Sequence, residues 1–399
     1  VKFKDVEIPY QYDKNNLPND ATIKVDFGKA RDQNFVQIYF YPLLNLNGSV
    51  KLVEEIELEV TSQMTESSFD RTASFAPNSV LASGEWYKIG VNRTGVHKID
   101  QSFLSSIGIN TSGLNPNHIN IYGNHVPQMP INNNTYRPDD LLKNAIYIEG
   151  DGDNSFDASD YILFYATGPD IESYGSDVIN VAKNNQDSLN YYFIHYDASD
   201  APKRVQTGTV STNPVTHNSS SFNDVVLWEQ NDVNLIKSGT RWLGHLFDIE
   251  LSKTLGLNLT DVNTAAQVEM RTVIASRVES GSGNMLITVN GTQQDNITCT
   301  NFSGSYNEAM LNSSTANFNV SSSSLNVVLT FNRTSPASTA WLDYIQFNYD
   351  RIATLSSEQI QIRDLGNVGA GNVVQYAVGS SSSNSFFWEV TDPSNATAI

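Results

Sequence analysis

The sequence predicts an all-β, multidomain protein in which small β domains precede a jelly-roll-like β-sandwich, with very little helix. Short runs of β-branched and aromatic residues, bounded by turn residues, recur along all 399 positions. The polar residues are largely Asn, Ser and Thr, which disfavour helix interiors because their short side chains compete for backbone hydrogen bonds. A chain of this length can hold two or three domains, each with its own core.

Residues 1–62 are predicted to form an N-terminal β domain. The run from Phe35 to Leu44 is rich in β-forming residues and contains Pro42, which ends the strand or places it at a sheet edge. Asn47-Gly48 then marks a tight hairpin turn before an alternating strand. Residues 63–79 show no periodicity, which predicts a linker.

Residues 80–215 are predicted to form a second β-rich domain that carries an acidic loop. Asp100 is expected to cap a short helix that stops at Gly108. Strands are expected over 86–91, 96–99, 119–124, 144–150, 161–168 and 191–197.

Residues 220–350 are predicted to form the jelly-roll-like sandwich, because seven short strands follow one another with turn signals such as Asn290-Gly291 between them. Residues 351–399 are a further β segment. The sandwich strands are expected within 225–229, 242–251, 266–276, 285–291, 318–321, 325–331 and 341–349.

Charge and composition exclude several functional classes. The 43 acidic and 24 basic residues give a formal charge of −19, which repels phosphate backbones and argues against a nucleic-acid partner. No run of 18 apolar residues could cross a bilayer as a helix. Cys299 is the only cysteine, so no disulfide can form within the chain. We expect a secreted protein, soluble outside the cell.

The motifs of hydrolases are missing. A cysteine nucleophile needs a nearby base to lower the pKa of its thiol, and Cys299 is flanked only by Thr298 and Thr300 in a strand-like stretch. The sequence has neither a Gly-x-Ser-x-Gly elbow nor a His-Glu-x-x-His helix. A free-standing hydrolase is therefore disfavoured, and Cys299 is predicted to be a structural thiol.

The tryptophans of the sandwich allow two interpretations. Trp228, Trp242 and Trp341 could form a sugar-stacking platform, as in a carbohydrate-binding or adhesive surface module. Alternatively they belong to the core, which we favour because alternating runs such as that from Trp341 to Phe347 point inward more often than outward.

The acidic loop between the strands at 144–150 and 161–168 is the strongest local signal. It fits a 12-residue calcium loop in which Asn154 takes the sharp-turn position usually held by Gly. The alternative is a solvated acidic turn held by local hydrogen bonds. The predicted calcium ligands are Glu149, Asp151, Asp153, the carbonyl of Ser155, Asp157 and Asp160.

Several segments together resemble the sortases of the type IX secretion system, which are surface members of the gingipain-like cysteine peptidases of Bacteroidetes. The most specific segment begins SVLASGEWYKIGVNRTGVHKID at Ser79 and continues through INIYGN to NAIYIEGDGDNSFDASDYILFYATGPD, which ends at Asp170. SGTRWLGHLFD, from Ser238 to Asp248, and FFWEVTDPSN, from Phe386 to Asn395, are further points of similarity.

The resemblance implies a function for a larger protein. Sortases of this family remove the C-terminal sorting signal from cargo at the outer-membrane surface and attach the cargo to anionic lipopolysaccharide. It implies two partners, the outer-membrane barrel PorV and the C-terminal signal domains of cargo. The family's catalytic His and Cys lie in a peptidase domain that follows the β domains, and no residue here matches them. The resemblance therefore implies a non-catalytic region, with 351–399 leading toward that peptidase domain.

Overall fold

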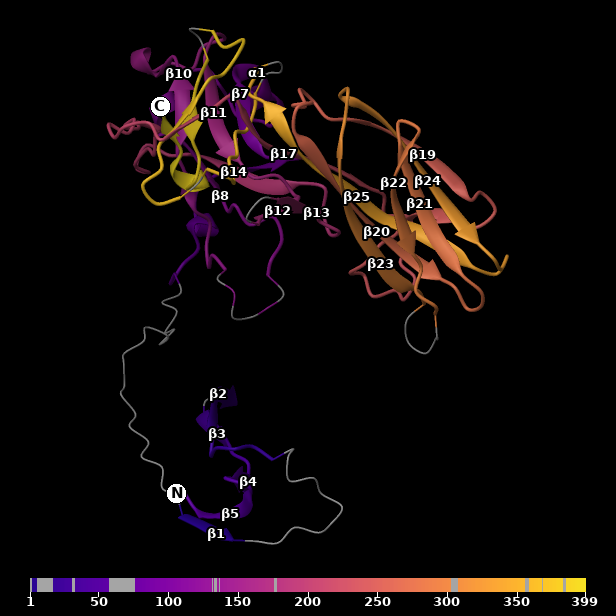
Figure 1. The fold of residues 1–399 in the computed structure, drawn as a ribbon. Coiled ribbons are helices and arrows are strands. Elements are labelled where there is room, and N and C mark those ends of the chain that lie inside the picture. Colours follow the sequence, from indigo (N-terminus) through magenta and orange to yellow (C-terminus); the bar gives the residue numbers. More distant parts are fainter. Residues whose placement is uncertain are drawn as a thin grey trace. The chain divides into compact units, whose positions relative to one another are not determined.

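The computed structural model describes residues 2–5, 17–30, 33–56, 76–130, 132, 135, 137–175, 178–302, 308–355, 359–367, 369–382 and 385–399. The chain divides into two compact units, Val1–Ser74 and Phe75–Ile399 (Figure 1). Regular structure in the described residues is almost entirely β, with a single short α-helix. The predicted all-β, multidomain class is confirmed.

The first unit consists of a small sheet and a hairpin. Strands β1, β5 and β4 form an antiparallel sheet in that order, and β2 pairs with β3. Asn47-Gly48 makes the predicted turn between β4 and β5, and the strand before it is interrupted at Pro42. Most of the predicted linker, 63–79, lies outside the described residues. The strands are β1 (Lys2–Asp5), β2 (Lys24–Ala30), β3 (Gln33–Tyr39), β4 (Leu43–Leu46) and β5 (Ser49–Glu55).

The second unit begins with two sheets that share one core. One has the order β10-β11-β7 and the other β6-β14-β8-β9. Alternate residues of these strands are apolar, so each sheet turns one face inward, as with Ile121 on β8 and Phe164 on β11. The strands are β6 (Trp86–Val91), β7 (Gly95–Asp100), β8 (Ile119–Gly123), β9 (Lys143–Asn144), β10 (Ile146–Glu149), β11 (Tyr161–Ala166) and β14 (Asn190–Tyr196).

The predicted helix forms beside this core as α1 (Gln101–Ser106). The side chain of Asp100 accepts a hydrogen bond of 2.8 Å from the backbone N–H of Phe103, which satisfies a donor that the helix leaves free. Leu104 is the residue of this helix that is buried in the core. No helix in the part of the chain that the structure describes has the length and apolar character of a membrane span.

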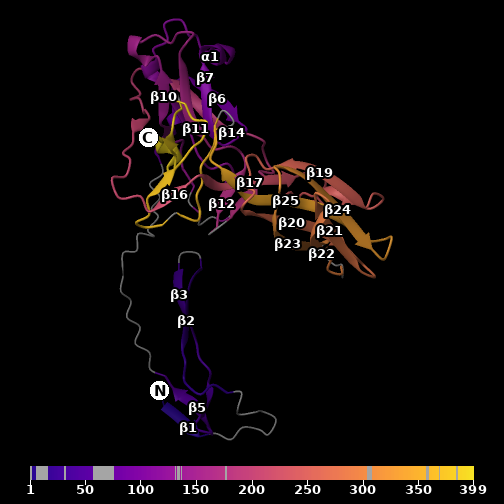
Figure 2. The ribbon, with the colours of Figure 1, turned by 45° about the horizontal axis from the view of Figure 1, so that its top comes forward.

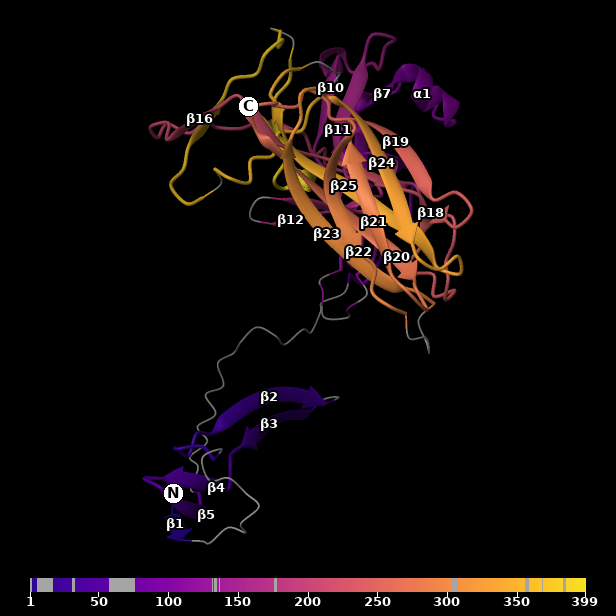
Figure 3. The same ribbon diagram turned by 45° about the vertical axis from the view of Figure 1, so that its right-hand side comes forward.

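The sandwich follows in the same unit, and Figure 3 shows its long strands side by side. One sheet has the order β17-β25-β20-β23, with β18 also paired to β25, and the other has the order β19-β24-β21-β22. Asn290-Gly291 forms the predicted turn between β21 and β22. The strands are β17 (Ser221–Glu229), β18 (Gly244–Phe247), β19 (Ser252–Asn258), β20 (Gln267–Arg277), β21 (Gly283–Val289), β22 (Thr292–Thr298), β23 (Met310–Asn319), β24 (Ser324–Arg333) and β25 (Thr339–Ile352).

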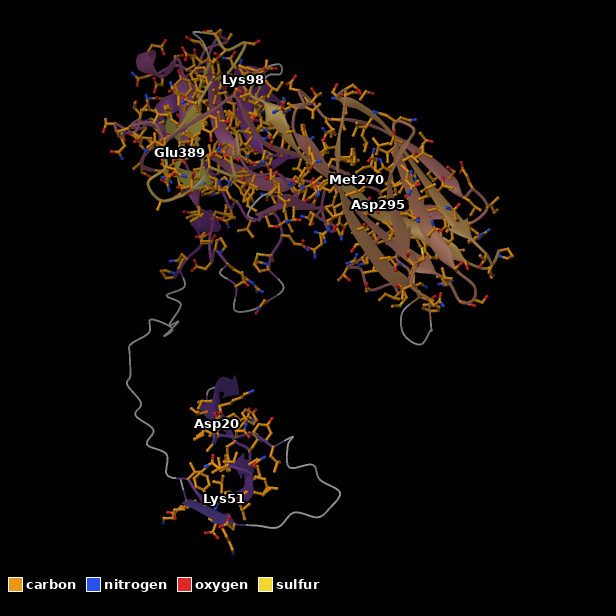
Figure 4. All side chains as sticks on the ribbon, in the orientation of Figure 1. Asp20, Lys51, Lys98, Met270, Asp295 and Glu389 are labelled. Carbon is orange, nitrogen blue, oxygen red and sulfur yellow. The ribbon has the colours of Figure 1, made fainter. Side chains whose placement is uncertain are left out.

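The sandwich core is continuous between its two sheets. Met270 on β20, labelled in Figure 4, is fully buried, as are Phe347 on β25 and Leu329 on β24. Strand alternation places every second residue of β20 and β24 in this core, and on β25 it does so from Ile345 onward, while the intervening residues lie on the outer faces.

After β25 the chain pairs with the segment that follows β14. Strand β26 (Val374–Tyr376) pairs in parallel with β16 (His217–Ser219). Strand β28 (Thr397–Ala398) lies between β15 (Gln206–Thr207) and β27 (Trp388–Glu389). The last segment of the chain is therefore built into the second unit.

One further hairpin positions the candidate site. Strands β12 (Ile171–Tyr174) and β13 (Ile179–Ala182) pair with each other and lie against the outer face of the sheet that contains β17 and β25 (Figure 2).

Candidate functional site

The acidic loop joins β10 to β11 with the backbone geometry that the sequence predicts. Asn154 has a φ of 64°, the left-handed conformation expected at the sharp turn, and Gly150 has a φ of 90°. A side chain at Gly150 would also collide with Asp160, because a Cβ there would lie 2.0 Å from Asp160 Oδ1. Phe156 is 1% exposed and anchors the loop in the core of the first two sheets.

The carboxylates of the loop make short local hydrogen bonds. Asp153 accepts a 2.9 Å bond from the backbone N–H of Ser155, whose hydroxyl donates to Asp157 at 3.1 Å. Asp160, which is buried, accepts a 2.7 Å bond from the backbone N–H of Asp157. Local hydrogen bonds of this kind are what the solvated acidic turn predicts.

At the start of the loop, Glu149 accepts a hydrogen bond from the Tyr147 hydroxyl, which together with burial raises the pKa of Tyr147 to about 12. Within the described residues, no three His, Cys, Asp or Glu side chains lie close enough together to hold a metal ion. Calcium binding would require Asp153, Asp157 and Asp160 to turn from their present partners toward a common centre. The calcium site of Glu149, Asp151, Asp153, Ser155, Asp157 and Asp160 therefore stays a prediction.

The three tryptophans of the sandwich do not form a common platform. Trp341 is 7% exposed and packs with Leu243 and Ala275, and Trp228 packs against the main sandwich core. Both pack among apolar side chains, Trp228 against the sandwich core and Trp341 in a separate buried cluster, so the prediction of core tryptophans holds for Trp228 and Trp341 is buried outside the main core. Trp242 is the exception, because it is only partly buried and lines an open cleft.

The cleft has a volume of about 470 Å³ and lies on the outer face of the β17–β25–β20 sheet. The β12–β13 hairpin forms one wall, and the segment from Thr240 to Trp242 forms another. Asn185 donates a 3.2 Å hydrogen bond to the carbonyl of Thr240, which links the two walls. The floor is made of residues that alternation turns outward, among them Glu229 and Arg271.

A β-bulge adds a carboxylate to this floor. Val273 pairs with Tyr344 and Ile274 pairs with Leu342, so Asp343 is the extra residue on β25. Asp343 is 5% exposed and receives a hydrogen bond and an ion pair from Arg241. Burial nevertheless raises the pKa of Asp343, against the opposing effect of Arg241.

Glu229 shares the cleft with Asp343. Burial raises the pKa of Glu229, and the negative charge of Asp343 adds to this effect, while a hydrogen bond with Asn231 opposes it. Two desolvated carboxylates thus border one cleft with Trp242. Perturbed carboxylates in a cleft are a common mark of a binding site.

The hairpin that walls the cleft is held by side-chain amides of β25. Gln346 accepts a 3.0 Å hydrogen bond from the N–H of Val181 and donates a 2.9 Å bond to the carbonyl of Ile179. Asn348 accepts a 2.9 Å bond from the N–H of Ile179. These amides supply the partners that a neighbouring strand would otherwise provide to β13.

An ion network lies on the other strand of the same hairpin, where Glu172 pairs with Val181. Arg363 binds both carboxylate oxygens of Glu172 on β12, at 2.8 and 2.9 Å, and it lies 3.6 Å from Asp224 on β17. Arg351 on β25 contacts Asp224 at 3.1 Å and Asp261 at 3.3 Å. The network joins the hairpin, the sandwich and the segment after β25.

Cys299 is buried, in agreement with the prediction of a structural thiol. Burial raises the pKa of Cys299, and a hydrogen bond with Ser276 opposes this only in part. A thiol with a raised pKa is a poor nucleophile.

Sequence reasoning missed the cleft residues Glu229, Arg241, Arg271 and Asp343. The alternation of β17 could have placed Glu229 on the outer face. The bulge at Asp343 has no sequence signal, because an extra residue in a strand is defined only by the partner strand. The prediction of a core position is wrong for Trp242, because this residue lies ahead of β18, outside the strand alternation, and is only partly buried.

Comparison with known proteins gives a structural likeness but no sequence-level family. No protein-family model matches the chain, and no curated protein sequence matches it significantly. The fold is similar to that in the crystal structure of dimeric latent PorU from Porphyromonas gingivalis, with a TM-score of 0.69 and 18% sequence identity. The match covers 80% of this chain and 29% of the PorU chain.

Two carbohydrate-binding modules match smaller parts of the chain. CBM36 in complex with calcium and xylotriose covers 31% of this chain and 98% of its own, with a TM-score of 0.20 and 10% identity. CBM35 from Cellvibrio japonicus Abf62 covers 35% of this chain and 99% of its own, with a TM-score of 0.19 and 9% identity. TM-scores this low do not establish a shared fold. The likeness to PorU establishes a PorU-like fold, and this chain spans less than a third of PorU.

Proposed function

We propose that this chain is a non-catalytic β region of a type IX secretion system sortase at the cell surface. In the full protein it would hold partners close to a peptidase domain that removes sorting signals from cargo and attaches the cargo to anionic lipopolysaccharide. The observation that carries the proposal is the PorU-like fold over 80% of the chain. The sequence resemblance from Ser79 to Asp170 and from Ser238 to Asp248 supports it independently.

A supporting role fits the way the second unit is built. The Gln346 and Arg363 contacts tie the β12–β13 hairpin to the sandwich. The last segment is tied to the first two sheets by hydrogen bonds between the Gln359 side chain and the backbone of Val96 on β7, and by a bond from the N–H of Ala145 to the carbonyl of Ser394. Such connections make the unit a rigid support, which is what positioning a separate peptidase domain would require.

The expected partners are the barrel PorV and the C-terminal signal domains of cargo. The test is recovery of PorV from solubilised outer membranes on the immobilised chain, beside the full-length protein and a full-length protein lacking residues 76–399. We expect the chain alone to retain PorV and the deleted protein to lose it. Retention by the deleted protein, with none by the chain, would assign docking to another region.

The chain alone is expected to leave cargo uncut, because Cys299 is buried with a raised pKa. The purified chain and its Cys299→Ser variant are incubated with a fluorescent cargo sorting-signal peptide. Cleavage that disappears in the variant would contradict a non-catalytic role.

We also propose a structural calcium ion in the loop from Glu149 to Asp160. Five carboxylates within 12 residues repel one another unless a cation is present, and the loop already has the left-handed turn at Asn154. Binding to the folded state alone would add about 2.7 kcal/mol at a hundredfold excess over the dissociation constant. The site would tie the end of β10 to the start of β11.

Thermal melting with calcium and with a chelator tests this site, in the original protein and in Asp151→Ala/Asp153→Ala. We expect calcium to raise the melting temperature of the original protein only. Identical melting in all four cases would favour the solvated turn.

A further inference from the structure

The cleft beside Trp242 has no place in the proposed sortase role, and its chemistry points to a ligand. Its lining includes the aromatic rings of Trp242 and Tyr344, two carboxylates, two guanidinium groups and the ammonium group of Lys183, all within the second unit. We propose that this cleft binds a short, uncharged oligosaccharide, with Trp242 as the stacking surface. This inference does not rest on the proposed function.

Trp242 has open space beside it in two places. It borders the main cleft, and it also borders a second hollow of about 350 Å³ lined by Val233, Asn234 and Lys237. An indole face carries partial negative charge, which attracts the weakly positive C–H groups on one face of a sugar ring. Because the Trp242 side chain borders both hollows, an oligosaccharide stacked on it could extend from one hollow into the other.

The polar groups of the cleft match sugar hydroxyls. Each hydroxyl both donates and accepts, so neighbouring hydroxyls are bound best by carboxylates and guanidinium groups that offer two acceptors or two donors in a plane. Glu229 and Asp343 supply acceptors, and Arg241 and Arg271 supply donors. Arg271 also contacts Asn180 on β13 at 3.4 Å, which holds it at the junction of floor and wall.

The charges of the cleft favour a neutral ligand. Arg241 pairs with Asp343, and Lys183 lies 3.5 Å from Asp170, so these cations already have anionic partners. Glu229 and Arg271 leave one charge of each sign in the lining. A strongly anionic ligand such as a phosphate would meet Glu229 and Asp343, whose repulsion would offset the attraction of Arg271.

The volume of the cleft and its fixed walls suit a short oligosaccharide. About 470 Å³ lies within the roughly 300–1,000 Å³ typical of small-molecule sites. The walls are set by hydrogen bonds rather than by loose packing, because Gln346 fixes β13 and Asn185 binds the carbonyl of Thr240. The site is therefore formed before a ligand arrives, which lowers the entropic cost of binding.

The test screens the purified chain on an array of neutral, uronic-acid and phosphorylated oligosaccharides, followed by titration calorimetry with the best neutral binder. Trp242→Ala and Glu229→Gln change the cleft, and Phe386→Ala, an exposed aromatic on the last segment, is the matched control. Circular dichroism melting of each variant shows whether it is folded.

We expect binding to neutral oligosaccharides with at least about a tenfold loss of affinity in both cleft variants and no change in Phe386→Ala. Glu229→Gln keeps the size of the side chain, so it separates loss of an acceptor from loss of the fold. No neutral binder at millimolar concentration would overturn the proposal. So would binding that both folded cleft variants retain, or a preference for phosphorylated sugars that Glu229→Gln strengthens.

Discussion

Strand β25 makes two interfaces of different chemistry from alternate residues of one sequence. Ile345 and Phe347 face the sandwich core and are fully buried among apolar side chains. Gln346 and Asn348 face the other way and are nearly as buried, at 2% and 8% exposed, yet they bind the backbone of β13 through their amides. The inner interface is apolar and the outer one is polar, although neither is open to solvent.

The two interfaces therefore fix different features of the fold. Apolar burial is non-directional, so the inner face holds the two sheets together without fixing the fine position of any one strand. Amide hydrogen bonds require a donor and an acceptor in line, so the outer face fixes where β13 lies along β25. The position of β13 sets the wall of the cleft, and the polar interface therefore determines the candidate site.

The largest expected effect is at the inner face. Phe347→Ala should lower the free energy of unfolding by about 3–5 kcal/mol, because it removes a fully buried ring and leaves a cavity. Denaturant unfolding measures the change. Leu246→Ala is the control, since Leu246 is 47% exposed and should change stability little. Equal effects of the two substitutions would contradict the assignment of Phe347 to the core.

The next effect separates the outer interface from the core. Arg363→Met should cost about 2–3 kcal/mol, less than the roughly 3–5 kcal/mol of a fully buried pair, because Glu172 is 22% exposed. It should loosen β12–β13 while the sandwich stays folded, since the core does not contain Arg363. Hydrogen exchange at the amides of Ile179 and Val181 reports this loosening.

The double variant Arg363→Met/Glu172→Leu sharpens that test. It leaves no unpaired carboxylate on β12, and Asp224 keeps its 3.1 Å contact with Arg351. It should therefore recover part of the lost stability. Uniformly faster exchange across the whole sandwich in either variant would show that the two interfaces are not separable.

The inner interface could be predicted from the sequence and the outer one could not. Alternation gives the strand along 341–349 and, from Ile345 onward, its apolar face, and Asn290-Gly291 and Asn47-Gly48 give their turns. The N-cap at Asp100 and the left-handed Asn154 were also predictable, because each depends on residues close in sequence.

The outer interface depends on partners far apart in the chain. Gln346 lies 165 residues from Val181, and nothing in either run indicates the other. Polar residues at 346 and 348 look like a solvent-exposed face, since a buried amide and an exposed one have the same sequence pattern. The cleft could not be predicted for the same reason, because its lining comes from β12, β13, β17, β20, β25 and the segment from Thr240 to Trp242.

A smaller effect is expected at a single amide of the outer interface. Gln346→Leu leaves the carbonyl of Ile179 and the N–H of Val181 without their side-chain partner, which should cost about 1–3 kcal/mol. Gln346→Glu keeps the acceptor for Val181 and loses only the donor to Ile179. If directional bonding holds β13, the two variants should differ in hydrogen exchange at Val181, and equal exchange there would favour simple packing.

The smallest effect is expected at Glu229, on the floor of the cleft beside this interface. Burial and the charge of Asp343 raise the pKa of Glu229, so the folded protein binds this proton more tightly than the unfolded chain does. The resulting stabilisation is fully present below the unfolded pKa and is lost as the pH rises through the folded pKa. At neutral pH the ionised Glu229 therefore disfavours the folded state.

Glu229→Gln removes this effect, because glutamine is uncharged at every pH and can still accept the hydrogen bond from Asn231. The variant should melt slightly above the original protein at about pH 7, and the difference should disappear toward about pH 4, where the carboxyl is protonated in both states. Carboxylates with lowered pKa values, such as Asp200, destabilise both proteins equally on acidification, so they cancel in the difference. Thermal melting of the two proteins across this range is the measurement. A variant that melts below the original protein at neutral pH would mean that the Glu229 charge has a stabilising partner, most directly Arg271 or Lys183 across the cleft.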